Sequence, residues 1–424
     1  MDNTVVHIDD VNQKTIVHEH ELSDQQQSKL IRKLVWKIDI HLIPFLALLY
    51  LCSFLDRINI GNAKLAGIEN DLHLTPSQYN VVLSIFFVGY VLFEVPSNLL
   101  LKLLGTSIWL PIIMIIWGII MMSMAAVKNY PGLLACRLFL GVAEAGLFPG
   151  VVFYLSLWYT RREQTLRLGL FFSAAVLAGS FGGVLAFGIT KLHNRENLKG
   201  WQWIFILEGI PAILLGIISY FYLPYSIETV KWLSDSERQA LNKHLKQGTN
   251  TTAIQKHFSW SEVKEAFIDK NVYIFMFAYI GNVTPFYSLS LFFPSIIHGM
   301  KFSNLTAQAM SAPPYAVACV LTICIAAHSG YRNERCFHIM GCSLLGIIGY
   351  ILLLTFPKYG QQAMYAASII ACAGTFSSIP PLLAWFTSNI GGSTKKAVAV
   401  AMIVGFGNLG GVFAGQHPDF RYVT

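Results

Sequence analysis

The sequence predicts an all-α protein that crosses a lipid bilayer many times, and two observations carry this prediction. Of its 424 residues, 54% are hydrophobic and 12% are charged, and the mean hydropathy is +0.53. Soluble domains carry about a quarter of charged residues, so this chain is far too apolar for that class. The charges are also segregated, and the apolar runs between them have the ~20-residue length that a membrane-crossing helix needs.

Eleven apolar runs meet this length, six before a charged segment at 224–270 and five after it. They are 42–63, 81–101, 108–127, 133–158, 168–190, 203–223, 272–297, 312–327, 336–355, 364–386 and 397–413. We therefore expect a polar tail (1–40), a six-helix bundle (41–223), a linker (224–270) with helices near 234–247 and 260–267, a five-helix bundle (271–415) and a short tail (416–424). This layout is that of a transporter with two six-helix bundles from which the twelfth helix is missing.

Basic residues set the predicted orientation. With the N-terminus on the cytoplasmic side, cytoplasmic segments hold 20 Lys and Arg residues and outer segments hold 7. Cytoplasmic loops of membrane proteins carry such an excess, so we expect a cytoplasmic N-terminus, a cytoplasmic linker and a multi-pass protein of the plasma membrane. The same bias explains the net charge of +7 without a nucleic-acid partner.

The sequence gives no sign of an enzyme, a metal site or a cofactor. The seven cysteines lie in or beside apolar runs without a CxxC motif, and we interpret them as packing residues. The predicted spans contain no Ser/His/Asp set, no histidines at metal-ligand spacing and no phosphate-binding glycine loop. We expect a monomer whose partners are lipid, protons and a small solute.

Ionisable residues inside the predicted spans mark the candidate site, because a charge near the bilayer centre costs about 3 kcal/mol or more. All of them are in the first half: Asp56, Arg57, Glu94, Arg137, Glu144 and Glu208. Helical periodicity puts Arg137 and Glu144 on one face, and likewise Tyr90 and Glu94. We expect Glu94 and Glu208 near span ends, in structural roles. The second half would line a shared cavity with aromatic and amide groups: Tyr279, Asn282, Tyr287, Trp385 and Asn408.

Two interpretations of these charges stay open. In the structural one, Asp56 pairs with Arg137 and Glu144 pairs with Arg57, although a buried ion pair rarely recovers its desolvation cost. In the functional one, the two arginines bind a substrate carboxylate in bidentate geometry. Asp56 and Glu144 then take up protons, because burial favours the neutral form of a carboxyl group.

Five segments also resemble a known family. They are 36–65 (WKIDIHLIPFLALLYLCSFLDRINIGNAKL), 96–105 (PSNLLLKLLG), 136–150 (CRLFLGVAEAGLFPG), 200–212 (GWQWIFILEGIPA) and 291–318 (LFFPSIIHGMKFSNLTAQAMSAPPYAVA). Their order and spacing resemble the anion:cation symporter family of the major facilitator superfamily. The last segment resembles its fungal branch, which includes allantoate, nicotinate, pantothenate and biotin permeases.

The resemblance implies two bundles around a cavity that opens alternately to each side, and proton-coupled transport of a small organic anion, such as a vitamin or ureide carboxylate. In bacterial sugar-acid symporters of this family, an Asp-Arg pair in the first helix and an Arg-x6-Glu in the fourth carry proton coupling and anion binding. The matching positions assign proton coupling to Asp56 and Glu144, and substrate binding to Arg57, Arg137, Tyr90, Trp385 and Asn408.

Two alternatives to transport remain open at this stage. One is a nutrient sensor on the same fold that signals without transporting, although the chain lacks the long cytoplasmic extensions that such receptors often carry. The other is a transporter that is inactive because its twelfth helix is missing.

Overall fold

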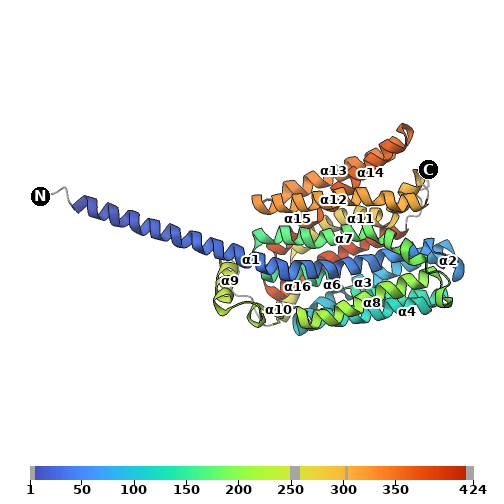
Figure 1. The fold of residues 1–424 in the computed structure, drawn as a ribbon, viewed down its shortest axis with the longest axis horizontal. Helices are drawn as coiled ribbons and strands as arrows, with labels where there is room; N and C mark the ends of the chain where they lie inside the picture. The colour runs from blue at the N-terminus through green and yellow to red at the C-terminus, as the bar shows by residue number, and fades with distance from the viewer. Residues whose placement is uncertain (1–4, 249–257, 301–303, 417–424) are drawn as a thin grey trace.

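The computed structural model describes residues 5–248, 258–300 and 304–416, and within these ranges the chain is helical without a β-strand (Figure 1). The helices of the first half are α1 (Val5–Leu65), α2 (Ile68–Asp71), α3 (Pro76–Leu104), α4 (Thr106–Ser123), α5 (Tyr130–Glu144), α6 (Leu147–Trp158), α7 (Arg161–Thr190) and α8 (Gly200–Tyr222). Those of the linker and second half are α9 (Asp235–Gly248), α10 (Trp260–Ile268), α11 (Lys270–Gly299), α12 (Asn304–Arg332), α13 (Cys336–Thr355), α14 (Gln361–Ser377), α15 (Ile379–Asn389) and α16 (Ser393–Gln416).

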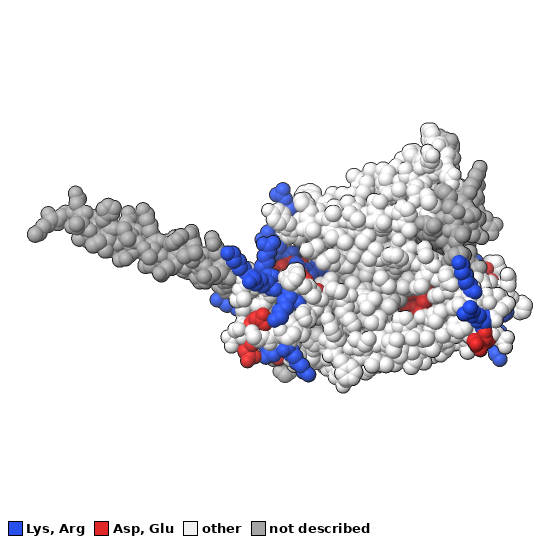
Figure 2. All heavy atoms as spheres, in the orientation of Figure 1, with Lys and Arg blue, Asp and Glu red and all other residues white. Residues whose placement is uncertain are grey.

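The described residues contain 11 helical segments that are long and apolar enough to cross a membrane. They run side by side in Figure 1. Charged side chains gather at the two ends of this body in Figure 2, with few between them on the face shown. This arrangement satisfies the backbone within each helix and presents apolar side chains to lipid. The predicted all-α, membrane-crossing fold is confirmed.

The first helix differs from the expected one. The sequence analysis placed a polar tail at 1–40 before a span at 42–63, whereas α1 runs without interruption from Val5 to Leu65. Figure 1 shows its N-terminal part extending beyond the other helices. The physical reason is local: residues 5–43 contain no Gly or Pro to stop the helix, and Pro44 is accommodated inside it.

Two of the spans are built from two consecutive helices. The fourth span consists of α5 and α6, and the tenth of α14 and α15, so each is interrupted within the membrane. Glu144 is the last residue of α5 and is fully buried at the first of these breaks. A helix end leaves backbone carbonyls without intrahelical partners, which is tolerated in a membrane only inside the protein.

Glycines allow close helix packing at the centre of the molecule. A Cβ added at Gly141 of α5 would lie 2.1 Å from the Phe86 carbonyl oxygen of α3, so only hydrogen fits between these two helices. A Cβ added at Gly407 of α16 would lie 2.2 Å from the Tyr279 ring of α11. Small residues bring membrane helices together in this way.

The two halves meet mainly along two helix pairs, α7 with α12 and α3 with α16. At the end of the body that carries the linker, arginine side chains add polar ties between the halves. The Arg335 Nη2 donates to the Arg161 carbonyl at 2.6 Å, and the Arg162 Nη2 donates to the Tyr331 carbonyl at 3.1 Å. Opening this end of the molecule would require both of these hydrogen bonds to break.

The helices of the linker match the predicted ones within one residue, and α9 is fixed to the first half. The Lys37 Nζ of α1 contacts the Glu237 carboxylate of α9 at 2.9 Å, and the His244 Nε2 lies 3.0 Å from a Glu163 oxygen of α7. The backbone N–H of Ser234 and the ammonium of Lys37 hold the pKa of Glu237 below its usual value.

By contrast, α10 is fixed to the second half. The Glu262 carboxylate accepts the backbone N–H groups of Thr394 and Lys395 at 2.8 and 3.0 Å, and so caps the N-terminus of α16. The Lys395 ammonium lies 2.8 Å from Asp269, and its hydrogen bond holds the pKa of that carboxyl below its usual value. The linker thus contacts both halves at one end of the molecule.

Candidate functional site

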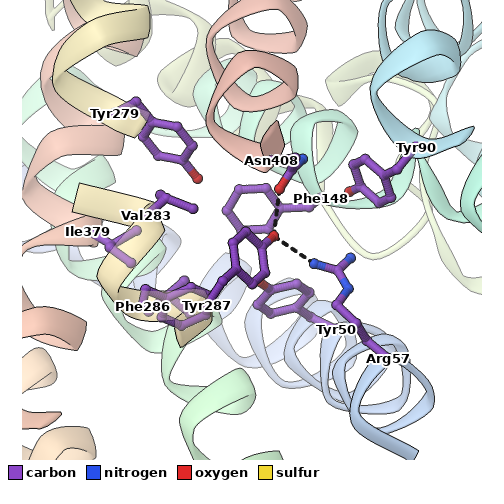
Figure 3. A pocket seen from close by; sticks show the side chains of 11 residues that line it. Tyr50, Arg57, Tyr90, Phe148, Tyr279, Val283, Phe286, Tyr287, Ile379 and Asn408 are labelled. Carbon is purple, nitrogen blue, oxygen red and sulfur yellow. Dashed lines mark hydrogen bonds between the residues drawn. The ribbon is translucent and has the colours of Figure 1, made fainter. Parts of the chain in front are cut away.

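A small cavity of about 10 Å³, called the pocket below, lies between the two halves (Figure 3). Helices α1, α3, α6 and α7 supply its wall from the first half, and α11, α15 and α16 supply its wall from the second. The lining residues are Tyr50, Arg57, Tyr90, Phe148, Phe172, Tyr279, Val283, Phe286, Tyr287, Ile379 and Asn408. Seven of these residues are aromatic and one, Arg57, carries a charge. The pocket is therefore an aromatic chamber with a single cationic group.

Hydrogen bonds connect Arg57 across the pocket to the second half. Its Nη1 donates to the Tyr287 hydroxyl at 2.9 Å, and that hydroxyl donates to the Asn408 Oδ1 at 2.5 Å (Figure 3). The Asn408 Nδ2 in turn donates to the Glu94 Oε2 of the first half at 3.1 Å. This relay (Arg57, Tyr287, Asn408, Glu94) joins the two halves at the level of the pocket.

The other side of the Arg57 guanidinium faces the fourth span. Its Nη2 lies 2.6 Å from the Glu144 Oε1, which also accepts a hydrogen bond from Ser53. The Tyr90 ring centroid lies 5.1 Å from the Arg57 Cζ, within cation–π range. Because Arg57 and Glu144 are 6% and 0% exposed, the pair is held in a low-dielectric environment where each charge depends on the other.

Four of the seven predicted substrate and proton residues lie outside the pocket lining: Glu144, which contacts Arg57, and Asp56, Arg137 and Trp385. The Asp56 Oδ2 accepts a hydrogen bond from the Trp117 Nε1 of α4 at 2.6 Å, inside the first half. The Arg137 Cζ lies 5.9 Å from the centroid of the Phe86 ring, and its Nε and Nη2 have no partner among the described residues. Trp385 packs edge-on against Phe275 at 5.2 Å.

The structure thus brings together part of the predicted set: Arg57, Tyr90 and Asn408 line the pocket, and Glu144 contacts Arg57. Of the two ion pairs in the structural interpretation of the charges, one is present. Glu144 pairs with Arg57, whereas the described residues show no ion pair between Asp56 and Arg137 within 4.0 Å.

The position of Glu94 differs from the one that the sequence predicts, and Ser53 is not among the residues that the sequence predicts for the site. Glu94 was expected near a span end, but it lies in the interior of α3, is fully buried and ends the relay. Its four-residue spacing from Tyr90, which lines the pocket, was the signal that could have found it. Glu208 also lies inside its helix, where it accepts a hydrogen bond from Asn59. Of the second-half groups, Asn282 bonds to Ser343 instead of lining the pocket.

The buried charges do not balance. Six Asp, Glu, Lys or Arg side chains are buried among the described residues, namely the four carboxyls of Asp56, Glu94, Glu144 and Glu208 and the guanidiniums of Arg57 and Arg137. Only Arg57 and Glu144 form an ion pair within this described set. An ionised carboxylate without a cation partner is very costly in such a place.

Comparison with known proteins identifies the family. Residues 46–415 match the family profile described as Major Facilitator Superfamily. The protein is 40% identical over 390 residues to the MFS transporter prlL of Fungal sp. (strain NRRL 50135), covering 91% of this chain and 79% of that one. It is 35% identical over 387 residues to a protein of Agrobacterium vitis named "Putative tartrate transporter", covering 91% and 87%.

A solved structure shows the same fold. The proton:xylose symporter XylE, bound to 6-bromo-6-deoxy-D-glucose, superposes with a TM-score of 0.67 at 15% identity, covering 88% of this chain and 87% of that one. At that identity the likeness concerns the fold alone. Together with the profile match over most of the chain, these relatives show that the protein belongs to the major facilitator superfamily of membrane transporters.

Proposed function

We propose that the protein is a proton-coupled secondary transporter of a small organic anion, working by alternating access. The observation that carries this proposal is the Arg57–Glu144 pair at the wall of a pocket between the two halves. A guanidinium in an aromatic chamber is a ready binding group for a carboxylate. The pocket is lined by both halves, so a rocking motion of one half against the other would expose it to either side.

The pair also provides a reason for proton coupling. Arg57 is already balanced by Glu144, so a substrate carboxylate can take its place only if Glu144 gives up the contact. An ionised Glu144 left alone in a fully buried position would cost several kcal/mol. A proton bound to Glu144 removes that cost. One carboxylate bound at Arg57 is therefore accompanied by one proton at Glu144, and release of both restores the ion pair.

The remaining predicted residues take supporting roles in this proposal. Asp56 has a hydrogen bond but no cation partner within the described residues, which suits a second proton-binding carboxyl. Arg137 is separated from the pocket lining by Phe86 and would act on the anion through its charge. Trp385 would act on the pocket through Phe275, which it contacts. Tyr90 and Asn408 would contact the substrate directly.

The lining favours one kind of anion. A single cation and seven aromatic rings suit a monocarboxylate with a flat apolar body. A dicarboxylate rich in hydroxyl groups, such as the tartrate in the name of the Agrobacterium vitis relative, would leave one carboxylate and its hydroxyls facing rings. We further place the linker and the N-terminus on the cytoplasmic side of the plasma membrane, because basic residues are concentrated at that end.

Uptake by proteoliposomes tests the proposal. The purified full chain would be offered a panel of labelled aromatic and aliphatic monocarboxylates, with tartrate for comparison, with and without an acidic exterior. We expect accumulation of a monocarboxylate that rises with the inward proton gradient and collapses with a protonophore. Arg57→Ala should abolish it. Absence of uptake for the whole panel, or uptake indifferent to the proton gradient, would reject proton-coupled anion transport and favour a sensor.

A further inference from the structure

Glu94 is a buried carboxyl group at the site that the exchange at Arg57 does not use. It is 0% exposed, its Oε2 accepts a hydrogen bond from Asn408, and its Oε1 has no partner among the described residues. The backbone of α16 packs closely against this carboxyl group, because a Cβ added at Gly405 would lie 3.0 Å from the Glu94 Oε2. The carboxyl therefore sits in a close-fitting cradle formed by one turn of α16, Gly405 to Asn408.

All three hydrogen bonds of the relay point the same way. Arg57 donates to Tyr287, Tyr287 donates to Asn408, and Asn408 donates to Glu94. A hydroxyl and an amide can each donate and accept, so the direction is set by the two ends of the relay. Arg57 can only donate, and an ionised Glu94 can only accept. A Glu94 Oε2 without a proton, in an ionised carboxylate or in a neutral carboxyl protonated on Oε1, can only accept, and this state imposes the direction of the relay.

A proton on the Glu94 Oε2 would reverse the far end of the relay. The carboxyl would then donate, and Asn408 would have to turn its Oδ1 toward Glu94 to accept that proton. Its Nδ2 would then face the Tyr287 hydroxyl, which would lose the acceptor it now uses at 2.5 Å. The Tyr287 oxygen would then face two donors, the Asn408 Nδ2 and the Arg57 Nη1, and we expect their competition to weaken its contact with Arg57. One N–H group of Arg57 would become free for the second oxygen of a substrate carboxylate.

We propose that Glu94 is a second coupling carboxyl, whose proton controls Arg57 through Asn408 and Tyr287. This inference rests on the proposed function, because it assigns Arg57 to the anion. Glu94 is a positioning residue, since it acts through two other side chains. The relay also crosses between the halves twice, so an ionised Glu94 holds α3 and α16 together at the pocket.

The titratable groups around Glu94 are few. Arg57 of α1 acts on it electrostatically. Glu94 in turn acts on the phenols of Tyr90 on its own helix and of Tyr279 and Tyr287 on α11. Helix α5 contributes Glu144, which is paired with Arg57. From α16 come the neutral Asn408 and Gly405. A change in the protonation of Glu94 can therefore act on one charged neighbour, Arg57, and through one chain of hydrogen bonds, the relay.

Infrared difference spectroscopy between acidic and neutral pH tests the inference on the purified full chain in lipid, with no substrate present. We expect the difference spectrum to contain a band of a buried protonated carboxyl together with a tyrosine ring band. Glu94→Gln should remove both. Glu208→Gln is the matched control, since it neutralises a buried carboxyl outside the relay, and it should leave the tyrosine band unchanged.

Two further variants keep the test decisive. Tyr287→Phe and Asn408→Ser interrupt the relay without altering the carboxyl, so the Glu94 band should remain while the tyrosine response is lost. An unchanged spectrum in Glu94→Gln, or an intact tyrosine response in Asn408→Ser, would overturn the inference. Failure of the transport proposal is distinguishable, because it appears as missing acid-driven uptake in the unmodified protein, whereas failure of the relay appears in substrate-free spectra.

Discussion

The substitution Arg57→Lys separates the charge of the proposed anion-binding group from its geometry. Arginine presents two N–H groups at once, one to Tyr287 at 2.9 Å and one to Glu144 at 2.6 Å. Lysine keeps the positive charge, but its ammonium is a point charge on a flexible stem and cannot hold a carboxylate through two parallel hydrogen bonds. The substitution should therefore weaken anion binding without abolishing it.

The magnitude follows from the loss of one charge-assisted hydrogen bond, which is worth about 1.5–3 kcal/mol. This converts to a dissociation constant on the order of 10- to 150-fold higher. Arg57→Ala should do more, because it also leaves the fully buried Glu144 without its cation, at a cost of about 3–5 kcal/mol. The assay is concentration-dependent uptake of the monocarboxylate that the unmodified protein accumulates in proteoliposomes.

Arg167→Lys provides the matched control for this experiment. Arg167 lies at the linker end of the molecule and also binds a carboxylate through two nitrogens. Its Nε and Nη2 lie 2.9 and 2.5 Å from the two oxygens of Asp39. It should lose a similar interaction while changing substrate affinity less than about fivefold, or under about 1 kcal/mol. Equal affinities for Arg57→Lys and the unmodified protein would refute the assignment of Arg57 as the anion-binding group.

Two other predictions concern packing and pH. Gly141→Ala should lower the melting temperature of the purified protein, because the added Cβ would lie 2.1 Å from the Phe86 carbonyl oxygen and overpacking costs about 1–3 kcal/mol. Gly188→Ala is the control: a Cβ there has no atom within 4 Å, so the melting temperature should not fall. The pKa of Glu237 is lower in the folded protein than in the unfolded chain, where it is about 4.3. The ionised Glu237 therefore contributes fully to the docking of the linker above pH ~4.3, and this contribution is lost as the pH falls through the pKa of the folded state. The protection factors of the α9 amides, which correct for the intrinsic pH dependence of exchange, should fall at that acidic pH and stay unchanged near neutrality. Protection in α9 that is already lost at neutral pH would contradict the Lys37 contact.

The membrane spans could be predicted from the sequence because the bilayer dictates them. Its thickness fixes the length of each apolar run, and the cost of a buried charge singles out the few ionisable residues that break a run. The two helices of the linker could be predicted from composition in the same way. The continuation of α1 back to Val5 was missed because hydropathy marks where a helix enters the membrane, not where the helix begins.

The partners of the buried charges could not be predicted, because they depend on the rotation and depth of helices that are distant in sequence. Asp56 and Arg57 are adjacent, yet one faces Trp117 within the first half and the other faces the pocket. Glu94 reaches the relay only because α16 approaches it through Gly405, a contact between residues more than 300 positions apart. Pattern analysis along one helix carries no information of this kind.

The proposed coupling of proton and anion at Glu144 is tested most directly by counting protons. Proteoliposomes loaded with a pH-sensitive dye would report proton entry while labelled monocarboxylate uptake is followed in the same sample. Our account predicts that proton entry accompanies anion uptake in the unmodified protein. In Glu144→Gln, anion exchange should persist while proton-driven accumulation disappears. Accumulation that still follows the proton gradient in Glu144→Gln would contradict the account.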